Sequence, residues 1–394
     1  MNLPETLIIN SYGGSLTIAT KQEQHPVIAS MEDDNFGVAS QVLNFPDLRY
    51  YRTLSDWPLD IDLKDKIVIC HPPCAAFSSN NRSRALNKRG ATSDAFACTT
   101  RILDYVLPRW PAAVAIESVP GALDGARHVH DRYANEWGYR PYRILQNAAS
   151  FGVAQWRRRF WLVLTRQDSF TCRVKHDIKH VRDVIPSDGE TGDCLDSHVK
   201  RMESQWVAWK KMGLTEDNVR YMLATNYGGL IRTTIKELGI KDDWHLKAKT
   251  GDPIDPLSYE RMCDAVVGAR FSCGSLHSLN PDGFAPVLLG TSWWWYANRM
   301  LGFQDYKKLM GFPAGYRFHD PRLTLILLSK GVCPPVARWV LRQIRENVYG
   351  FKPDNVAWDI EQPMTPGDVA DLRLDNKHNP NFGPAIRRER ECLQ

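Results

Sequence analysis

Two residues combine chemical reactivity with a place at the end of an apolar run. Cys74 follows "KIVIC" and two prolines in "HPPCAAFS", and Glu117 lies at the end of "AAVAIES". A thiolate is a strong nucleophile, and a buried carboxyl group is unfavourable unless it has a partner or a task. We therefore expect Cys74 and Glu117 to belong to a reactive site. Cys70, inside the apolar run, fits a small buried thiol instead.

Apolar runs of strand length recur through the first part of the chain. They are "TLIIN", "HPVIASM", "KIVICH", "AAVAIES" and "RFWLVLT", with "DAFACTTRILDYVLP" at helical spacing between two of them. This alternation predicts an α/β fold with a doubly wound, parallel sheet. Ligands bind beyond the carboxyl ends of the strands in such a sheet, so we expect Cys74 and Glu117 to lie together there.

Two further strand ends carry residues suited to a nucleotide. Gly13 and Gly14 follow the first run, and glycine lets a backbone approach a ligand closely. Glu32 follows the second run and could accept hydrogen bonds from ribose hydroxyls. A plain turn at the glycines and a solvated acidic turn at Glu32 are the alternatives.

Length and composition fit a chain of two domains. The chain has 394 residues, 43% of them hydrophobic, which is enough for a large core. An odd number of cysteines, nine, and a start without a leader pattern favour free thiols in the cytoplasm. Apolar runs stay too short for a membrane span, and the net charge of +5 fits a nucleic-acid partner only weakly.

The order of the motifs resembles that of the DNA cytosine carbon-5 methyltransferases. "PPCAAFS" corresponds to the family's Pro-Cys-Gln-x-Phe-Ser, "ESV" to its Glu-Asn-Val, and "QWRRR" to its Gln-x-Arg-x-Arg. "RMLGFQDYKKLMGFP" and "GVCPPVA" are similar to its last two motifs. The resemblance implies a Rossmann-like S-adenosylmethionine-dependent methyltransferase domain at 1–167 and 295–350, with a smaller, irregular target-recognition domain at 168–294. The polar residues 351–394 are expected to form a loosely ordered tail.

The resemblance also implies the catalytic roles. Cys74 would add to carbon 6 of cytosine, which turns the ring into an enamine that attacks an electrophilic carbon. Glu117 would contact ring nitrogen 3 and the exocyclic amine. Arg157 and Arg159 would hold the thiol loop and the base carbonyl oxygen, while Arg158 alternates to the other face. A neighbouring helix N-terminus and the arginines should lower the pKa of Cys74, and the target base must be flipped out of the duplex.

Donor and DNA contacts follow from the same resemblance. The donor-binding residues would be Ser11, Tyr12, Gly13, Gly14, Glu32, Asp56, Pro73, Lys330 and Val332. The DNA contacts would be Ser78, Gln155, Lys200, Arg201, Lys210, Lys211, Arg220 and Arg232, the last six among aromatic residues of the variable segment. No metal is implied. We expect a monomer in the cytoplasm, associated with the nucleoid through double-stranded DNA.

The sequence departs from the family's pattern at several positions. Ser11 stands at the first glycine of the donor motif, Ala75 replaces the glutamine after the cysteine, and Ser118 replaces the asparagine after the glutamate. The largest change is Ser329 and Lys330, where the family has Gly-Asn beside the donor's methionine portion.

Lys330 bears on the identity of the donor. A cation within about 5 Å of the sulfonium of S-adenosylmethionine would oppose binding by about 3 kcal/mol at an effective dielectric near 20. Carboxy-S-adenosylmethionine, whose transferred carbon bears a carboxylate, would instead pair with Lys330 and yield 5-carboxymethylcytosine. Ala75 would leave room for the larger group. The alternative is that Lys330 extends into solvent and ordinary S-adenosylmethionine-dependent methylation proceeds.

Two other classes share the motifs. An RNA cytosine methyltransferase would use the same chemistry, since one branch of the family acts on tRNA. An inactive DNA-binding relative would keep the fold without turnover, although Cys74, Glu117, Arg157 and Arg159 are all present. The long variable segment favours DNA as the substrate.

Overall fold

The computed structural model describes residues 2–52, 56–58, 60–78, 90–187, 276–288, 293–296, 299–320, 323–352 and 354–374. Two of the residues predicted to contact DNA, Ser78 and Gln155, lie within these ranges. The other six lie outside the described residues: Lys200, Arg201, Lys210, Lys211, Arg220 and Arg232.

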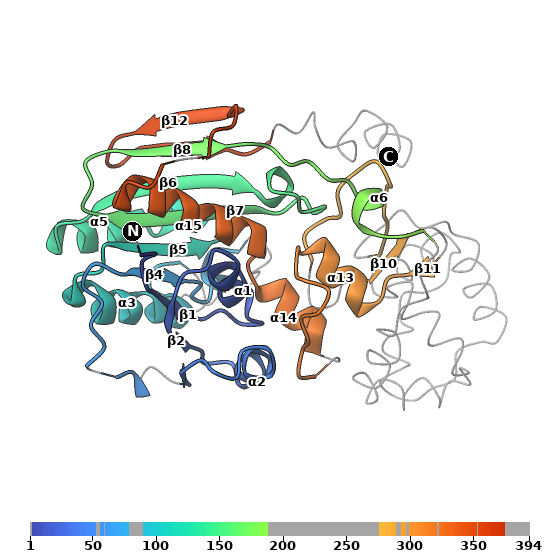
Figure 1. The fold of residues 1–394 in the computed structure, drawn as a ribbon, viewed down its shortest axis with the longest axis horizontal. Coiled ribbons are helices and arrows are strands. Elements are labelled where there is room, and N and C mark those ends of the chain that lie inside the picture. Colours follow the sequence, from blue (N-terminus) through green and yellow to red (C-terminus); the bar gives the residue numbers. More distant parts are fainter. Residues whose placement is uncertain are drawn as a thin grey trace, which may run out of the picture.

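One eight-stranded sheet forms the centre of the protein, with the strand order β13-β6-β7-β5-β4-β1-β2-β3 (Figure 1). Its strands are β1 (Thr6–Ile9), β2 (Val27–Met31), β3 (Tyr50–Tyr51), β4 (Ile67–Cys70), β5 (Ala113–Ser118), β6 (Arg140–Asn147), β7 (Arg158–Thr165) and β13 (Val369–Leu372). All five apolar runs noted in the sequence form strands of this sheet. The predicted α/β fold is confirmed.

Strand β7 reverses the parallel pattern, because it is antiparallel to both of its neighbours, β5 and β6. The sequence-based prediction of a parallel strand at "RFWLVLT" is therefore wrong. Only residues 148–157 separate β6 from β7, and they contain no α-helix that could cross over the sheet. The chain consequently turns back, and the start of β7 comes to lie beside the end of β5.

Helices cover both faces of the sheet (Figure 1). The helices are α1 (Ser15–Gln22), α2 (Asn35–Asn44), α3 (Asp94–Val106), α4 (Ala122–Gly125), α5 (Arg127–Glu136), α6 (Val181–Val184), α13 (Phe303–Leu309), α14 (Thr324–Lys330) and α15 (Pro334–Tyr349). Helices α1 and α15 pack against one face with Ile8 and Ile69, whereas α3 and α5 pack against the other with Leu7 and Val68. The two-sided cover explains why these strands are apolar throughout.

Apolar side chains of α13, α14 and α15 belong to the same core as those of α1, whereas the predicted domain boundary near residue 295 stays a prediction. Within the described ranges, the stretch Thr324–Tyr349 has the length and hydropathy of a membrane-spanning helix, but 72% of that window is buried inside the fold. A smaller three-stranded sheet contains β9 (Leu276–Ser278), β10 (Trp293–Tyr296) and β11 (Arg299–Met300).

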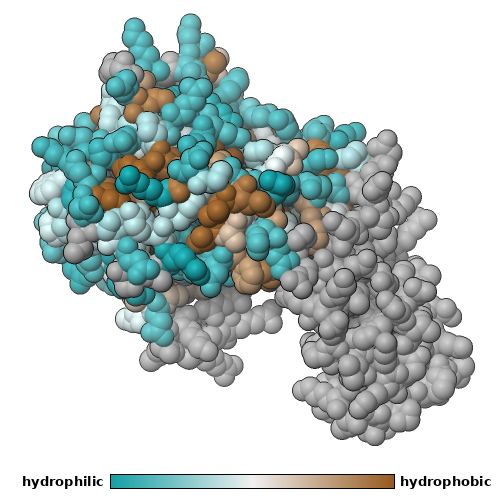
Figure 2. Space-filling view, turned by 60° about the horizontal axis from the view of Figure 1, so that its bottom comes forward, coloured by the Kyte–Doolittle hydropathy of each residue, from teal (hydrophilic) through white to brown (hydrophobic). Residues whose placement is uncertain are grey.

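Helix α2 follows β2 and leaves apolar side chains in solvent. Phe36, Val42 and Leu43 are 47%, 42% and 39% exposed. Figure 2 brings this side of the molecule forward and shows hydrophobic patches among hydrophilic residues. The helix begins at a defined point, because Asp34 Oδ1 accepts hydrogen bonds from the backbone N–H groups of Phe36 and Gly37 at 3.0 and 2.9 Å.

The segment after residue 350 is more ordered than its polar composition suggested. Residues 360–364 form β12 (Ile360–Met364), which pairs antiparallel with β8 (Phe170–Val174), and β13 adds a parallel edge strand to the main sheet beside β6. The prediction of a loosely ordered tail is therefore wrong for these residues. Their order depends on partners more than 170 residues away, so local composition could not reveal it.

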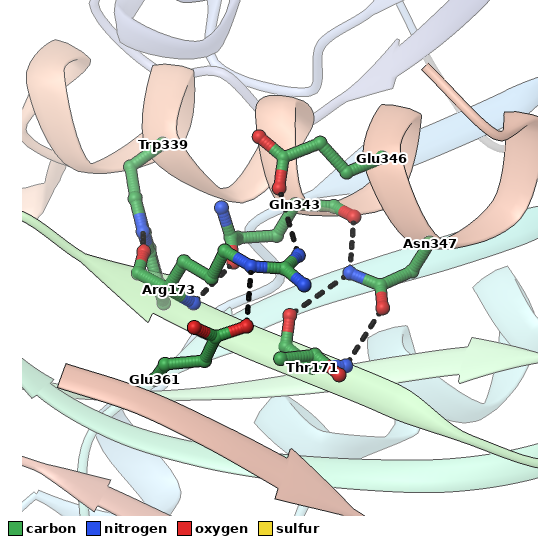
Figure 3. A network of polar contacts seen from close by, with 7 residues as sticks. All are labelled: Thr171, Arg173, Trp339, Gln343, Glu346, Asn347 and Glu361. Carbon is green, nitrogen blue, oxygen red and sulfur yellow. Dashed lines mark hydrogen bonds and ion pairs between the residues drawn. The ribbon is translucent and has the colours of Figure 1, made fainter. Parts of the chain in front are cut away.

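Side chains of α15 complete the hydrogen bonding of β8 on the edge opposite β12 (Figure 3). The backbone N–H of Thr171 donates to Oδ1 of Asn347 at 2.7 Å, and Nδ2 of Asn347 donates to the carbonyl of Thr171 at 3.0 Å. The N–H of Arg173 donates to Oε1 of Gln343 at 2.7 Å, and Nε1 of Trp339 donates to the carbonyl of Arg173 at 2.8 Å. The helix thus replaces a neighbouring strand and fixes β8 to the core.

We expect Asn347→Leu to destabilise the protein by about 2 kcal/mol, because it leaves the N–H and carbonyl of Thr171 without partners at nearly constant side-chain volume. Urea unfolding measures the difference. Asn355→Leu is the matched control, since Asn355 is exposed and its replacement should leave the midpoint unchanged. Equal midpoints for Asn347→Leu and the parent would contradict the role assigned to Asn347.

Candidate active site

The loop after β4 presents the candidate nucleophile. Cys74 precedes a single 3₁₀ turn, Ala75–Phe77, and its carbonyl accepts the N–H of Phe77 at 3.1 Å. The turn packs closely on the segment after β5, where a Cβ added to Gly125 would come within 2.7 Å of the Phe77 ring. With the φ angles of the two preceding prolines also restricted, the thiol is held in a stiff, half-buried loop.

Glu117 is fully buried between two nitrogen-bearing side chains. Its Oε1 lies 2.9 Å from Nε of Arg159, and its Oε2 lies 3.1 Å from Nε2 of His71. The antiparallel register explains the first contact: Glu117 pairs with Trp161, so Arg159 is its diagonal neighbour on the same face. Burial raises the pKa of Glu117 to about 7, against the lowering effect of Arg159 and Arg157. The carboxyl group can therefore carry a proton near neutral pH.

The pKa of Cys74 is raised rather than lowered. Burial is the largest cause and the charge of Glu117 is the second, whereas Arg159 and Arg157 act in the opposite direction. The sequence-based expectation of a lowered pKa is therefore wrong for this state, because loss of solvent outweighs the two arginines. Thiolate formation becomes easier once Glu117 is neutral.

Arg157 holds a different segment from the one predicted. Its guanidinium Nη2 donates to the carbonyls of Gly331 and Ser329 at 2.7 and 3.2 Å. These residues flank Lys330 at the end of α14. Arg157 therefore fixes the turn that carries Lys330, and the expected contact with the thiol loop is replaced by this one. Arg158 points elsewhere, with its guanidinium 5.7 Å from the ring centroid of Trp156.

Ser11, where the family has glycine, has a local structural role. Its Oγ accepts the backbone N–H groups of Leu16 and Thr17 at 2.9 and 3.3 Å, in the first turn of α1. The hydroxyl thus satisfies two N–H groups that a helix start otherwise leaves open. The substitution is compatible with the loop between β1 and α1.

The two glycines of this loop are required by neighbouring protein atoms. Gly14 has a φ of +88°, and a Cβ there would come within 2.1 Å of the Tyr316 hydroxyl. A Cβ on Gly13 would lie 2.8 Å from the ring of Phe318. The close approach predicted for a ligand is thus observed for two aromatic side chains of the segment after α13. This packing joins the loop to the C-terminal part of the domain.

The Glu32 side chain is buried beside the loop between β1 and α1. It is 2% exposed, and its Oε1 accepts the N–H of Asp34 at 3.1 Å, whereas Oε2 has no hydrogen-bond partner in the described part of the chain. Burial raises the pKa of Glu32 to about 8. An unpaired carboxylate oxygen at this strand end fits the hydroxyl groups of a ribose, so the residues present suit a nucleoside-containing donor.

Lys330 lies beside the loop between β1 and α1, residues 10–14, which is called the donor loop below because the sequence predicts that it binds the donor. Its Nζ is 4.0 Å from Oδ2 of Asp34 and 5.8 Å from the ring centroid of Tyr12, and its side chain is 51% exposed. Val332, two residues on, donates its N–H to Oγ of Ser15 at 3.2 Å. The segment "SKGV" therefore packs beside the start of α1.

The other predicted residues that the structure describes lie at separate places around the site. Pro73 lies in the loop before Cys74, and Ser78 is half-buried just after the 3₁₀ turn. Asp56 is exposed beyond β3, and its place in the donor site stays a prediction. Gln155 is fully buried, and its contact with DNA stays a prediction.

His71 was missed in the sequence, although it lies directly after a buried strand. It is 2% exposed and contacts Glu117. The rule applied to Glu117, that a polar group at the end of an apolar run needs a partner, would have identified it.

Comparisons with known proteins agree with this geometry. Residues 10–346 match the family described as C-5 cytosine-specific DNA methylase. No curated protein gave a significant match. Three solved structures illustrate the similarity of fold. A protein described as a DNA modification methyltransferase encoded within an E. coli prophage has 16% identity and a TM-score of 0.53, covering 88% of this chain and 99% of its own.

The Entamoeba histolytica methyltransferase EhMeth has 10% identity and a TM-score of 0.55, with 88% and 99% of the two chains covered. The S. pombe Dnmt2 methyltransferase has 13% identity and a TM-score of 0.52, with 87% and 98% covered. At these identities the likeness shows a shared fold.

The raised pKa of Glu32 predicts a pH-dependent stability. Between the ordinary carboxyl range near 4.5 and about 8, the folded protein holds a proton that the unfolded chain releases, so this group lowers stability as pH rises. We expect Glu32→Gln to be more stable than the parent at pH 8, by on the order of 3 kcal/mol, and nearly equal to it at pH 4.5.

Thermal unfolding of both proteins across this pH range measures the effect. Glu136→Gln, at an exposed glutamate, is the control and should follow the parent. S-adenosylmethionine, whose ribose hydroxyls would stabilise the ionised carboxylate, should protect the parent more at pH 8 than at pH 6. The same stability difference between variant and parent at every pH would contradict the burial argument.

Proposed function

This chain belongs to the C-5 cytosine-specific DNA methylase family, and from that premise we propose that it transfers a carboxymethyl group from carboxy-S-adenosylmethionine to a cytosine of double-stranded DNA. The product would be 5-carboxymethylcytosine. The observation that carries the proposal is the position of Lys330 at the donor loop, within 5.8 Å of the Tyr12 ring.

The backbone of Lys330 is fixed from both sides. Arg157 binds the carbonyls of Ser329 and Gly331, so the lysine stem starts from a defined point. Its ammonium group then lies near Tyr12 and Asp34, on a side chain that is 51% exposed. A donor with a sulfonium cation alone would add a like charge beside this lysine, at a penalty of about 3 kcal/mol for a separation near 5 Å. A carboxylate on the transferred carbon would reverse the sign of the interaction.

The side chains around Glu117 support the cytosine chemistry. Cys74, as a thiolate, would form a bond to carbon 6 while the electrons of the carbon 5–carbon 6 double bond move towards ring nitrogen 3. Glu117 would donate its proton there, and Arg159 would keep the carboxyl group in place. Carbon 5 of the enamine would then attack the electrophilic carbon, and the donor would leave as a neutral thioether that keeps the electron pair of the broken carbon–sulfur bond. Nitrogen 3 would return its proton to Glu117. Solvent would accept the carbon 5 proton, and the electrons of that bond would restore the carbon 5–carbon 6 double bond and expel Cys74 as a thiolate.

The base must leave the helix for this reaction. Cys74 and Glu117 lie half-buried and fully buried at one sheet edge, out of reach of a base that stays stacked. A flipped cytosine would present its Watson–Crick edge to Glu117. We therefore propose duplex DNA as the substrate of a monomeric enzyme in the cytoplasm.

Ordinary methylation from S-adenosylmethionine is the second candidate. One observation favours it: Asp34 lies 4.0 Å from Lys330 and partly balances its charge. In that case the lysine would be tolerated beside the sulfonium without selecting a carboxylated donor.

Lys330→Asn should shift donor preference towards S-adenosylmethionine by tenfold or more, because one charge-assisted contact to the donor is lost. Asp34→Asn should shift it the opposite way, since the amide keeps the cap of α2 while freeing Lys330. Mass spectrometry of nucleosides from duplex DNA treated with each donor measures both products. Lys352→Asn, at an exposed lysine, is the control. Efficient methylation by the parent with no use of the carboxylated donor would overturn the proposal.

Cys74→Ser should abolish product formation and leave DNA affinity largely intact, because the thiol acts after binding and base flipping. Product can be followed by nucleoside mass spectrometry and affinity by gel shift. Cys172→Ala on β8 removes a buried thiol away from the site and should retain activity. Turnover of Cys74→Ser above a few per cent of the parent rate is incompatible with the assignment.

A further inference from the structure

His71 connects the two halves of the candidate site. Its Nε2 lies 3.1 Å from Oε2 of Glu117, and its ring meets the Tyr12 ring edge-on, with centroids 5.2 Å apart and planes at 67°. The histidine is 2% exposed, and within the described residues neither of its ring nitrogens makes a hydrogen bond, so the approach of Nε2 to Glu117 is a close polar contact. A single buried ring therefore touches both the cytosine-facing carboxyl group and the donor loop.

We propose that His71 is a positioning residue, a neutral imidazole that orients the carboxyl group of Glu117 and couples it to Tyr12 in the donor loop. The inference rests on the cytosine chemistry of the proposed function and is independent of whether the donor carries a carboxylate. It assigns no direct contact between His71 and either substrate.

The surroundings keep the imidazole uncharged. Burial is the largest cause of a pKa of His71 well below its ordinary value, and the nearby cations Arg159 and Arg157 act in the same direction. A neutral ring with its proton on Nε2 would place an N–H dipole 3.1 Å from Oε2 without adding charge. A protonated histidine would hold Glu117 as a carboxylate, whereas the neutral ring leaves it able to bind a proton near neutral pH.

The groups that face Glu117 come from several elements. His71 follows β4, Arg159 is on β7, and Arg157 precedes β7. Cys74 precedes the 3₁₀ turn, and Cys333 precedes α15. The two thiols interact electrostatically with Glu117. Because only the two arginines carry a permanent charge, the removal of His71 removes a close polar contact of Glu117 without changing the net charge around it.

The contact between His71 and Tyr12 links the Glu117 carboxyl group to the donor loop. Tyr12 lies in the donor loop at a φ of 50°, and Lys330 approaches its ring. An edge-to-face pair has a preferred geometry, so a change at Tyr12 alters the position of the imidazole. The protonation of Glu117 should then depend on the donor loop.

The pH dependence of Cys74 alkylation by iodoacetamide tests the proposal in the free protein, without DNA or donor. Ionised Glu117 opposes the thiolate. His71→Leu removes the N–H donor, which should raise the pKa of Glu117, so the pH at which Glu117 begins to suppress alkylation should rise by about one unit. His71→Gln restores an N–H donor and should return part of the shift. Mass spectrometry of the Cys74 peptide measures the rate.

A double-mutant cycle shows whether the effect passes through Glu117. In a Glu117→Gln background, His71→Leu should leave the Cys74 profile unchanged. Tyr12→Leu should move the profile in the same direction as His71→Leu, and Tyr12→Phe, which keeps the ring, should not. These tyrosine variants test the coupling even if His71→Leu fails to fold.

Identical profiles for the parent, His71→Leu and Tyr12→Leu would overturn the proposal, as would a shift that persists in Glu117→Gln. In transfer assays, His71→Leu should lower kcat more than it raises KM for DNA. If neither donor yields product with the parent, the proposed function fails, and the alkylation profiles still decide the role of His71.

Discussion

The burial of Glu117 constrains the arrangement of the whole site. A carboxyl group without solvent contact requires partners, and here Arg159 and His71 each lie against one of its oxygens. They do not restore a fully ionised carboxylate, because burial still raises its pKa towards neutrality. The burial of Glu117 thus has two consequences: the side chain needs the contacts that hold it in place, and its raised pKa lets it bind a proton near neutral pH.

The position of Arg159 depends on the reversed strand. In a purely parallel sheet, the strand after β6 would begin at the end of the sheet opposite to the one where β5 terminates. The short connection from β6 instead turns β7 back and brings Arg157 and Arg159 to the edge where Cys74 and Glu117 lie. The antiparallel strand is therefore a requirement of the site and not only a feature of topology.

Arg157 connects this end of the sheet to the C-terminal half of the domain. Its hydrogen bonds to the carbonyls on both sides of Lys330 join segments more than 170 residues apart in sequence. The glycine loop is packed on the same half through Tyr316 and Phe318. Cys74, Glu117 and the donor loop are consequently held in place by the same C-terminal half of the domain. Helix α15 attaches this half to β8 through hydrogen bonds.

The sequence by itself determined the positions of five of the eight strands of the main sheet, because apolar runs of strand length reflect burial on both faces. It also identified Cys74 and Glu117, because motif order and the unfavourable burial of a carboxyl group are readable locally. Tertiary structure alone decided the direction of β7, the strand formed by Val369–Leu372, the partner of Arg157 and the setting of Lys330. It also decided the pKa of Cys74, since the balance between burial and two arginines depends on their distances in the folded chain. Contacts between residues hundreds of positions apart have no local signature, so periodicity and motif spacing could not reveal them.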